Sequence, residues 1–141
     1  MIRGMILAAV FGLAAVGMAA AQRNESHSGA VTTLAAREIE EKVDGKEAMA
    51  TAVEVTLEAG QASHPHRHPG PVLGYVLAGK YEWAIDNQPA KVLKTGETFY
   101  EPAGCLHRVS KNPGKTTTRV LAWVIHPRDA KDLTFPETGK K

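Results

Sequence analysis

The sequence predicts an all-β domain, an antiparallel barrel or sandwich, on three observations. Turn signals recur about every eight to twelve residues, among them Asp86-Asn87 and Asn112-Pro113-Gly114. Short segments rich in β-branched and aromatic residues lie between these turns, and no helical period of hydrophobic residues runs through them. The chain of 141 residues has the length of one such domain.

The strands are expected at residues 51–57, 73–77, 81–85, 91–93, 98–101, 107–110 and 116–125. In the first of them, Val53, Val55 and Leu57 alternate and therefore share one face. Residues 35–42 are compatible with a helical turn, and residues 43–46 read as a loop. The tail beyond His126 is charged and contains two prolines, so we expect it to pack loosely or to cross to a neighbouring molecule, with His126 at the surface.

Residues 1–21 have the features of a secretory signal peptide. Arg3 precedes an uncharged, mostly apolar run, and Ala19-Ala20-Ala21 is a cleavage pattern of the A-x-A type. We favour cleavage after Ala21 over an uncleaved membrane anchor, because the apolar run is short and rich in Ala and Gly. The prediction is a secreted or periplasmic protein, with a disordered leader at 22–30 and one domain at 31–141.

The charge balance limits the classes of binding partner, and the cysteine content limits the disulfides that can form. The chain has 17 Lys and Arg against 15 Asp and Glu, and loss of Arg3 with the signal leaves 16 against 15. This balance does not favour a nucleic acid or an acidic membrane surface as partner. Cys105 is the single cysteine, so no internal disulfide forms and the exported domain depends on its hydrophobic core.

Histidines gather in two segments. His64, His66 and His68 occupy alternate positions, and in an extended strand His66 and His68 point to one face while Arg67 points to the other. His107 follows a Pro-x-Gly turn in the second segment. Two neutral imidazoles on one face need only partners from another strand to make a metal site.

These two segments, 60–79 and 96–112, resemble the two motifs of the cupin superfamily. The matching residues are Gly60, His66, His68 and Gly79 in the first motif and Gly96, Pro102, Gly104 and His107 in the second, with Asn112 one residue late. The resemblance implies an antiparallel jelly roll that holds a divalent transition metal, Zn, Cu, Fe, Mn or Ni, through His66, His68 and His107. It also implies a small-molecule ligand or substrate and a homodimer.

One residue departs from the family pattern. Val72 stands where the first motif has a metal-binding Glu. Three neutral histidines would leave the metal with its full charge, as in the three-His cupins such as thiol and diketone dioxygenases, which this site resembles. Gly74 shares the face of Val72 and is expected to add space.

Three more residues are candidates for the site. His64 is either a fourth ligand or, as we prefer, a residue at the rim. Cys105 is either a thiol facing the cavity or, preferably, a small buried hydrophobic residue. Glu101 is the acid nearest the second motif and is a weak candidate for a group that supports the ligands. Two functions remain open: a metal-dependent, dioxygenase-like enzyme, and a non-catalytic module that senses or sequesters a metal or small ligand.

Overall fold

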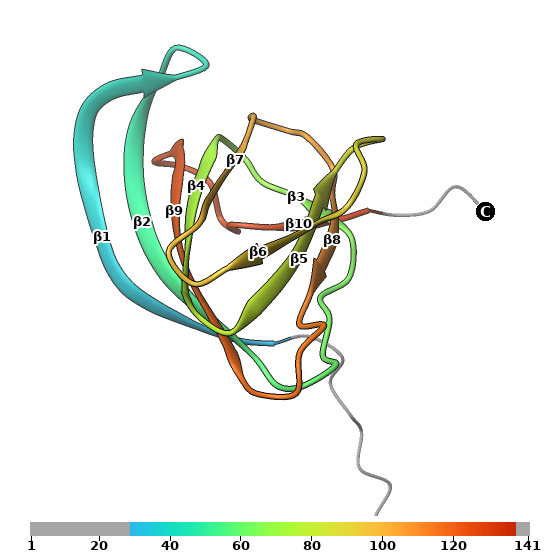
Figure 1. Cartoon of the computed structure of the whole chain (residues 1–141). Helices are drawn as coiled ribbons and strands as arrows, with labels where there is room; N and C mark the ends of the chain where they lie inside the picture. The colour runs from blue at the N-terminus through green and yellow to red at the C-terminus, as the bar shows by residue number, and fades with distance from the viewer. Residues whose placement is uncertain (1–28, 138–141) are drawn as a thin grey trace, which may run out of the picture.

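The computed structural model describes residues 29–137, which form two five-stranded sheets facing each other (Figure 1). The strands are β1 (Ala30–Val43), β2 (Lys46–Leu57), β3 (His66–Arg67), β4 (Val72–Ala78), β5 (Lys80–Ile85), β6 (Lys91–Lys94), β7 (Thr98–Glu101), β8 (His107–Lys111), β9 (Thr118–Pro127) and β10 (Phe135–Pro136). The strand order is β1-β2-β9-β4-β7 in one sheet and β10-β3-β8-β5-β6 in the other.

All strand pairs within these residues are antiparallel, and none of the described residues is helical. The predicted all-β architecture is therefore confirmed. The described part of the chain accordingly offers no helix long and apolar enough to cross a membrane. The predicted signal peptide, and the predicted leader up to residue 28, lie outside the described residues.

The expectation of a helical turn at 35–42 is wrong, because these residues belong to the long strand β1. β1 and β2 form a curved hairpin that extends beyond the barrel (Figure 1). Asp44 and Gly45 connect them, and both have positive φ, 50° and 73°, as the tight turns of hairpins require. Local preference for helix among Ala, Glu and Lys is overridden here by pairing along almost the whole of β2.

The core lies between the sheets and follows the two-residue period of the strands. In β4, Val72, Gly74 and Val76 are buried while Leu73 and Tyr75 are exposed. The buried cluster takes residues from both sheets, for example Val124 from β9 and Trp83 from β5. Burial of this alternate set is the main favourable term in folding, since the described residues contain no disulfide.

The last part of the chain differs from the expectation. His126 is buried rather than at the surface, and its Nε2 lies 2.9 Å from the hydroxyl of Thr51 on β2. The tail folds back onto its own barrel, because Phe135 and Pro136 of β10 pair with Arg67 and His66 of β3. Antiparallel pairing of His66 with both Pro136 and His107 places the histidine strand between β10 and β8.

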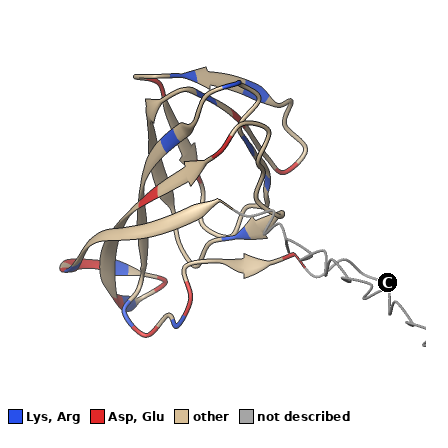
Figure 2. Ribbon diagram, turned by 90° about the horizontal axis from the view of Figure 1, so that it is seen from below, with Lys and Arg blue, Asp and Glu red and all other residues tan. Residues whose placement is uncertain are grey.

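Charged residues are distributed without separation by sign. Basic and acidic positions are interspersed along the strands and the connecting turns (Figure 2). Several form exposed pairs, such as Arg119 with Glu54 at 2.7 Å and Lys46 with Asp129 at 3.1 Å. This pattern agrees with the nearly balanced composition of the chain.

Candidate metal centre

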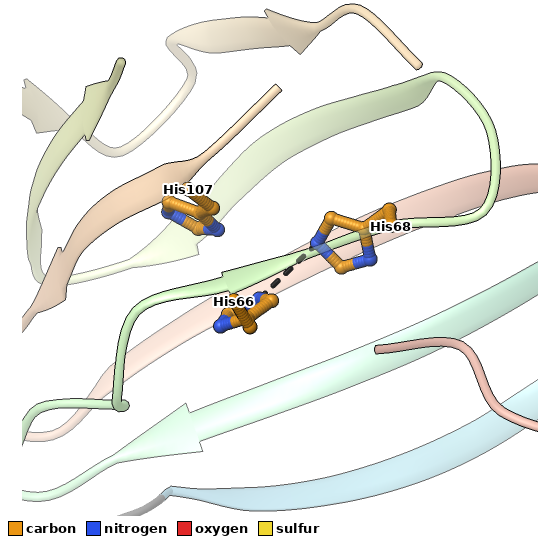
Figure 3. A group of neighbouring side chains, drawn as sticks. All are labelled: His66, His68 and His107. Atoms are coloured by element: carbon orange, nitrogen blue, oxygen red, sulfur yellow. Dashed lines mark hydrogen bonds between the residues drawn. The ribbon is translucent and has the colours of Figure 1, made fainter. Parts of the chain in front are cut away.

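His66, His68 and His107 converge inside the barrel (Figure 3). The Nε2 atoms of His66 and His68 are 3.2 Å apart, and one nitrogen from each of the three rings lies within 4.8 Å of the others. His66 lies on β3, and His68 follows directly after the end of that strand. His107 lies on β8 and is the register partner of His66. The alternation predicted for His66 and His68 thus brings them to one face, while Arg67 points away to Glu137 at 3.0 Å.

Backbone carbonyls orient two of the rings. Nδ1 of His66 lies 2.8 Å from the carbonyl oxygen of His64, and Nδ1 of His68 lies 2.7 Å from that of Leu133. In each case the Nδ1–H donates to the carbonyl, so that Nε2 carries its lone pair toward the other histidines. This is the tautomer that a metal ligand needs.

Burial keeps the inner histidines neutral. Desolvation, followed by the charge of His66, lowers the pKa of His68 from its usual 6.5 to about 4. Desolvation, followed by the charges of His66 and His68, lowers the pKa of His107 to about 3. Both rings are therefore unprotonated at neutral pH and available as ligands.

Glu101 is a buried carboxylate beside the histidines. It ends β7 with 1% of its surface exposed, and Trp83 Nε1 donates to its Oε1 at 2.9 Å. Its Oε2 lies 3.4 Å from Nε2 of His68, and its Oε1 lies 3.2 Å from Nδ1 of His107. Burial raises the pKa of this carboxyl from 4.5 to about 7. The sequence could have indicated that Glu101 is buried. Residues two apart in a strand share a face, and Phe99, two residues before Glu101, is a core residue.

Two buried side-chain atoms of the described residues lack a hydrogen-bond partner, and both belong to this cluster. They are Oε2 of Glu101 and Nδ1 of His107. Buried polar atoms are almost always paired, so two such atoms side by side call for a partner of another kind. A cation held by the three imidazoles beside them would provide it, and imidazole nitrogens suit Zn, Cu, Fe, Mn and Ni.

A cavity of about 260 Å³ adjoins the cluster. Its walls are mostly apolar and come from both sheets, and they include Val53, Val55, Val72, Phe99, Val120 and Val124. The polar groups on its lining include His66, His68, His107 and Glu101. The volume lies slightly below the usual range for small-molecule pockets, so the cavity suits a small ligand.

Not every candidate residue joins the cluster. His64 lines the cavity but is not among the three clustered rings, and its carbonyl orients His66 instead. Cys105 is a buried core residue that does not line the cavity, and burial raises the pKa of its thiol to about 11. Gly74 does not add space: a Cβ there would lie 1.9 Å from Cζ of Phe99, whose ring already fills the position.

Residues 53–124, just over half of the chain, match the family model for the cupin domain. The chain belongs to the cupin family. Comparison of this cupin with curated protein sequences finds no significant match.

Solved structures share its fold. The DMSP lyase DddQ from Ruegeria pomeroyi aligns with a TM-score of 0.58 and 19% identity over 81% of this chain and 54% of the lyase. An uncharacterized protein with a double-stranded β-helix domain from Klebsiella pneumoniae gives 0.56 and 20% over 77% and 84%. Oxalate oxidase bound to the substrate analogue glycolate gives 0.55 and 24% over 75% and 54%. The cupin thus spans about half the length of the lyase and the oxidase.

Proposed function

We propose that this cupin is an exported, metal-dependent protein that binds a divalent transition metal at His66, His68 and His107 and transforms a small molecule in the adjoining cavity. The observation that carries the proposal is the pair of unpartnered buried atoms, Glu101 Oε2 and His107 Nδ1, beside three converging imidazoles. Retaining such atoms without a partner is costly, and a cation at this point offsets that cost.

The cavity suggests the shape of the molecule. Valines and Phe99 are prominent among the lining residues, so a ligand in the cavity has an apolar body. The histidines and Glu101 also line the cavity, so the ligand is expected to carry a polar group that contacts them. Tyr81 offers a further hydroxyl, which donates to Ser110 Oγ at 2.9 Å and lies 3.3 Å from Nε2 of His107.

The chemistry that we favour is oxidation with dioxygen. A redox-active metal, when bound, supplies the activation of dioxygen. The chain's own residues exclude water through the apolar walls and bind the polar group of the ligand beside the histidines. The alternative is a non-catalytic module that senses or sequesters a metal or ligand, which the single small domain also accommodates.

Export and pairing complete the proposal. The signal peptide at residues 1–21 delivers the protein to the periplasm or the medium, and N-terminal sequencing of the exported protein is expected to find a chain that begins at Gln22. The homodimer that we propose uses the exposed apolar residues Leu73, Tyr100 and Trp123, because Leu73 is the register partner of both others and the three form one patch. Trp123→Glu, but not Val92→Glu on the other sheet, should convert a dimer to a monomer in light scattering.

Metal analysis of protein purified from the exported fraction tests the central claim. Stoichiometric metal in the wild type, and its loss from His66→Ala, His68→Ala and His107→Ala, is expected. His64→Ala keeps the carbonyl that orients His66 and should retain the metal. Oxygen uptake by Fe(II)-loaded protein with a panel of small thiols and 1,3-diketones separates the enzyme from the binding module. A wild type without metal, with histidine variants that behave identically, would end the metal-dependent proposal.

A further inference from the structure

Glu101 lies opposite Val72 on the neighbouring strand. Val72 occupies the position at which the first cupin motif has its metal-binding Glu. The two residues are register partners in the antiparallel pair of β4 and β7. Residues directly opposite in such a pair have Cβ atoms about 4.5–5.5 Å apart and point to the same face. Both are buried and both line the cavity. A side chain at 101 therefore enters the same space as one at 72, from one strand further along the sheet.

The contacts of Glu101 direct one oxygen to the histidines. Trp83 holds Oε1 from the side of β5, which leaves Oε2 without a hydrogen bond and 3.4 Å from His68 Nε2. Two ligands that bind one ion at about 2.0–2.2 Å lie roughly 2.8–3.6 Å apart for bond angles between octahedral and tetrahedral. The separation of His66 Nε2 from His68 Nε2, 3.2 Å, and that of Glu101 Oε2 from His68 Nε2 both agree with this range.

We propose that Glu101 supplies the metal with the carboxylate that position 72 lacks, so that the site is a three-His, one-carboxylate site with the acid moved across the β4–β7 pair. The inference rests on the proposed metal binding at His66, His68 and His107. It changes the expectation drawn from Val72, because the carboxylate reduces the net charge of the centre by one. It also adds a hard oxygen donor, which favours Fe and Mn more than three imidazoles alone do.

The test compares three variants with the wild-type protein. Glu101→Gln keeps the size of the side chain and an oxygen for Trp83 but removes the charge. Glu54→Gln is the control, since Glu54 pairs with Arg119 on the outer face of the sheet. Val72→Glu combined with Glu101→Val returns the carboxylate to the family position. Two measurements are made: the Kd for Zn²⁺ in competition with a chromogenic chelator, and the visible absorption of the Co²⁺-loaded protein.

Zn²⁺ affinity is expected to fall at least about tenfold in Glu101→Gln, a loss typical of removing a group that ligates or supports a metal. The Co²⁺ spectrum should change in the same variant, and the double variant should recover affinity. Glu54→Gln should match the wild type. Wild-type affinity and spectrum in Glu101→Gln would overturn the inference and leave the three-His proposal standing. Weakened binding with an unchanged spectrum would also overturn it, because Glu101 would then act from outside the coordination sphere. A wild type that binds neither ion would overturn the proposed function itself.

Discussion

Val72 and Glu101 face each other across the β4–β7 pair, so an apolar residue and a carboxylate enter one cavity from adjacent strands. A sequence motif describes residues along one strand, and at position 72 it shows only that the metal-binding Glu of the family is absent. The sheet register shows that an acid is nevertheless present in the same space. Under the proposed ligation by Glu101, the net charge of the metal centre depends on residues from two adjacent strands and not on position 72 alone.

The stability of the metal-free protein should depend on pH in a direction set by these buried groups. His68 and His107 have pKa values of about 4 and 3, below their usual 6.5, so the stability they contribute is complete above pH 6.5 and is lost as pH falls through 4 and 3. Glu101 has a raised pKa of about 7 against 4.5, so its contribution is complete below pH 4.5 and is lost as pH rises through 7. The two histidines together change the stability more than the single Glu101 does, so the free energy of unfolding should fall from pH 6 to pH 4.

Urea denaturation of EDTA-treated protein over this range measures the effect. Glu101→Gln removes the opposing contribution, so its stability should fall more steeply than that of the wild type between pH 6 and pH 4.5. A wild type whose stability rises steadily as the solution is acidified would contradict neutral, buried histidines.

The sequence predicted the strands of the barrel because their two-residue period is directly visible, as in Val53, Val55 and Leu57. His66 and His68 were predictable for a related reason, since spacing within a strand fixes the face to which a side chain points, whereas His107 was predicted from the resemblance to the second cupin motif. What it could not show is which strands are neighbours. The pairing of β10 with β3 and the burial of His126 against Thr51 depend on residues 68 to 75 apart in the chain. Glu101 belongs to the same class.

Asn112 should prove essential for stability although it touches no histidine. Its amide nitrogen donates to the carbonyls of Leu57 and Thr116, at 2.9 and 2.8 Å, and its oxygen accepts from Gly114 N at 2.8 Å. The side chain is fully buried. Asn112→Ala removes three hydrogen bonds, each contributing about 0.5–1.5 kcal/mol, so we expect a loss of roughly 2–4 kcal/mol in chemical denaturation. Asn87→Ala in an exposed turn is the control and should cost less than about 0.5 kcal/mol. Equal losses in the two variants would contradict a structural role for Asn112.

Gly74 is expected to tolerate no side chain while Phe99 is present. The Cβ of Gly74→Ala would lie 1.9–2.4 Å from three atoms of the Phe99 ring, so the ring must move within the core. Overpacking of this kind costs about 1–3 kcal/mol. Combining Gly74→Ala with Phe99→Leu should cost less than the sum of the two single changes, because the smaller residue relieves the clash. Strictly additive losses in urea denaturation would show that Phe99 is not what excludes a side chain at position 74.

Cys105 should react slowly with alkylating agents in the folded protein. Burial raises the pKa of its thiol to about 11, so the thiolate that attacks the reagent is scarce at neutral pH. We expect iodoacetamide to label native protein at least about 100-fold more slowly than urea-unfolded protein, in line with a shift of two pH units from the ordinary value of 9. Zn²⁺ should leave the native rate unchanged, because Cys105 does not line the cavity. Rapid labelling that Zn²⁺ suppresses would instead place the thiol among the metal ligands, and Cys105→Ala would then be expected to weaken Zn²⁺ binding.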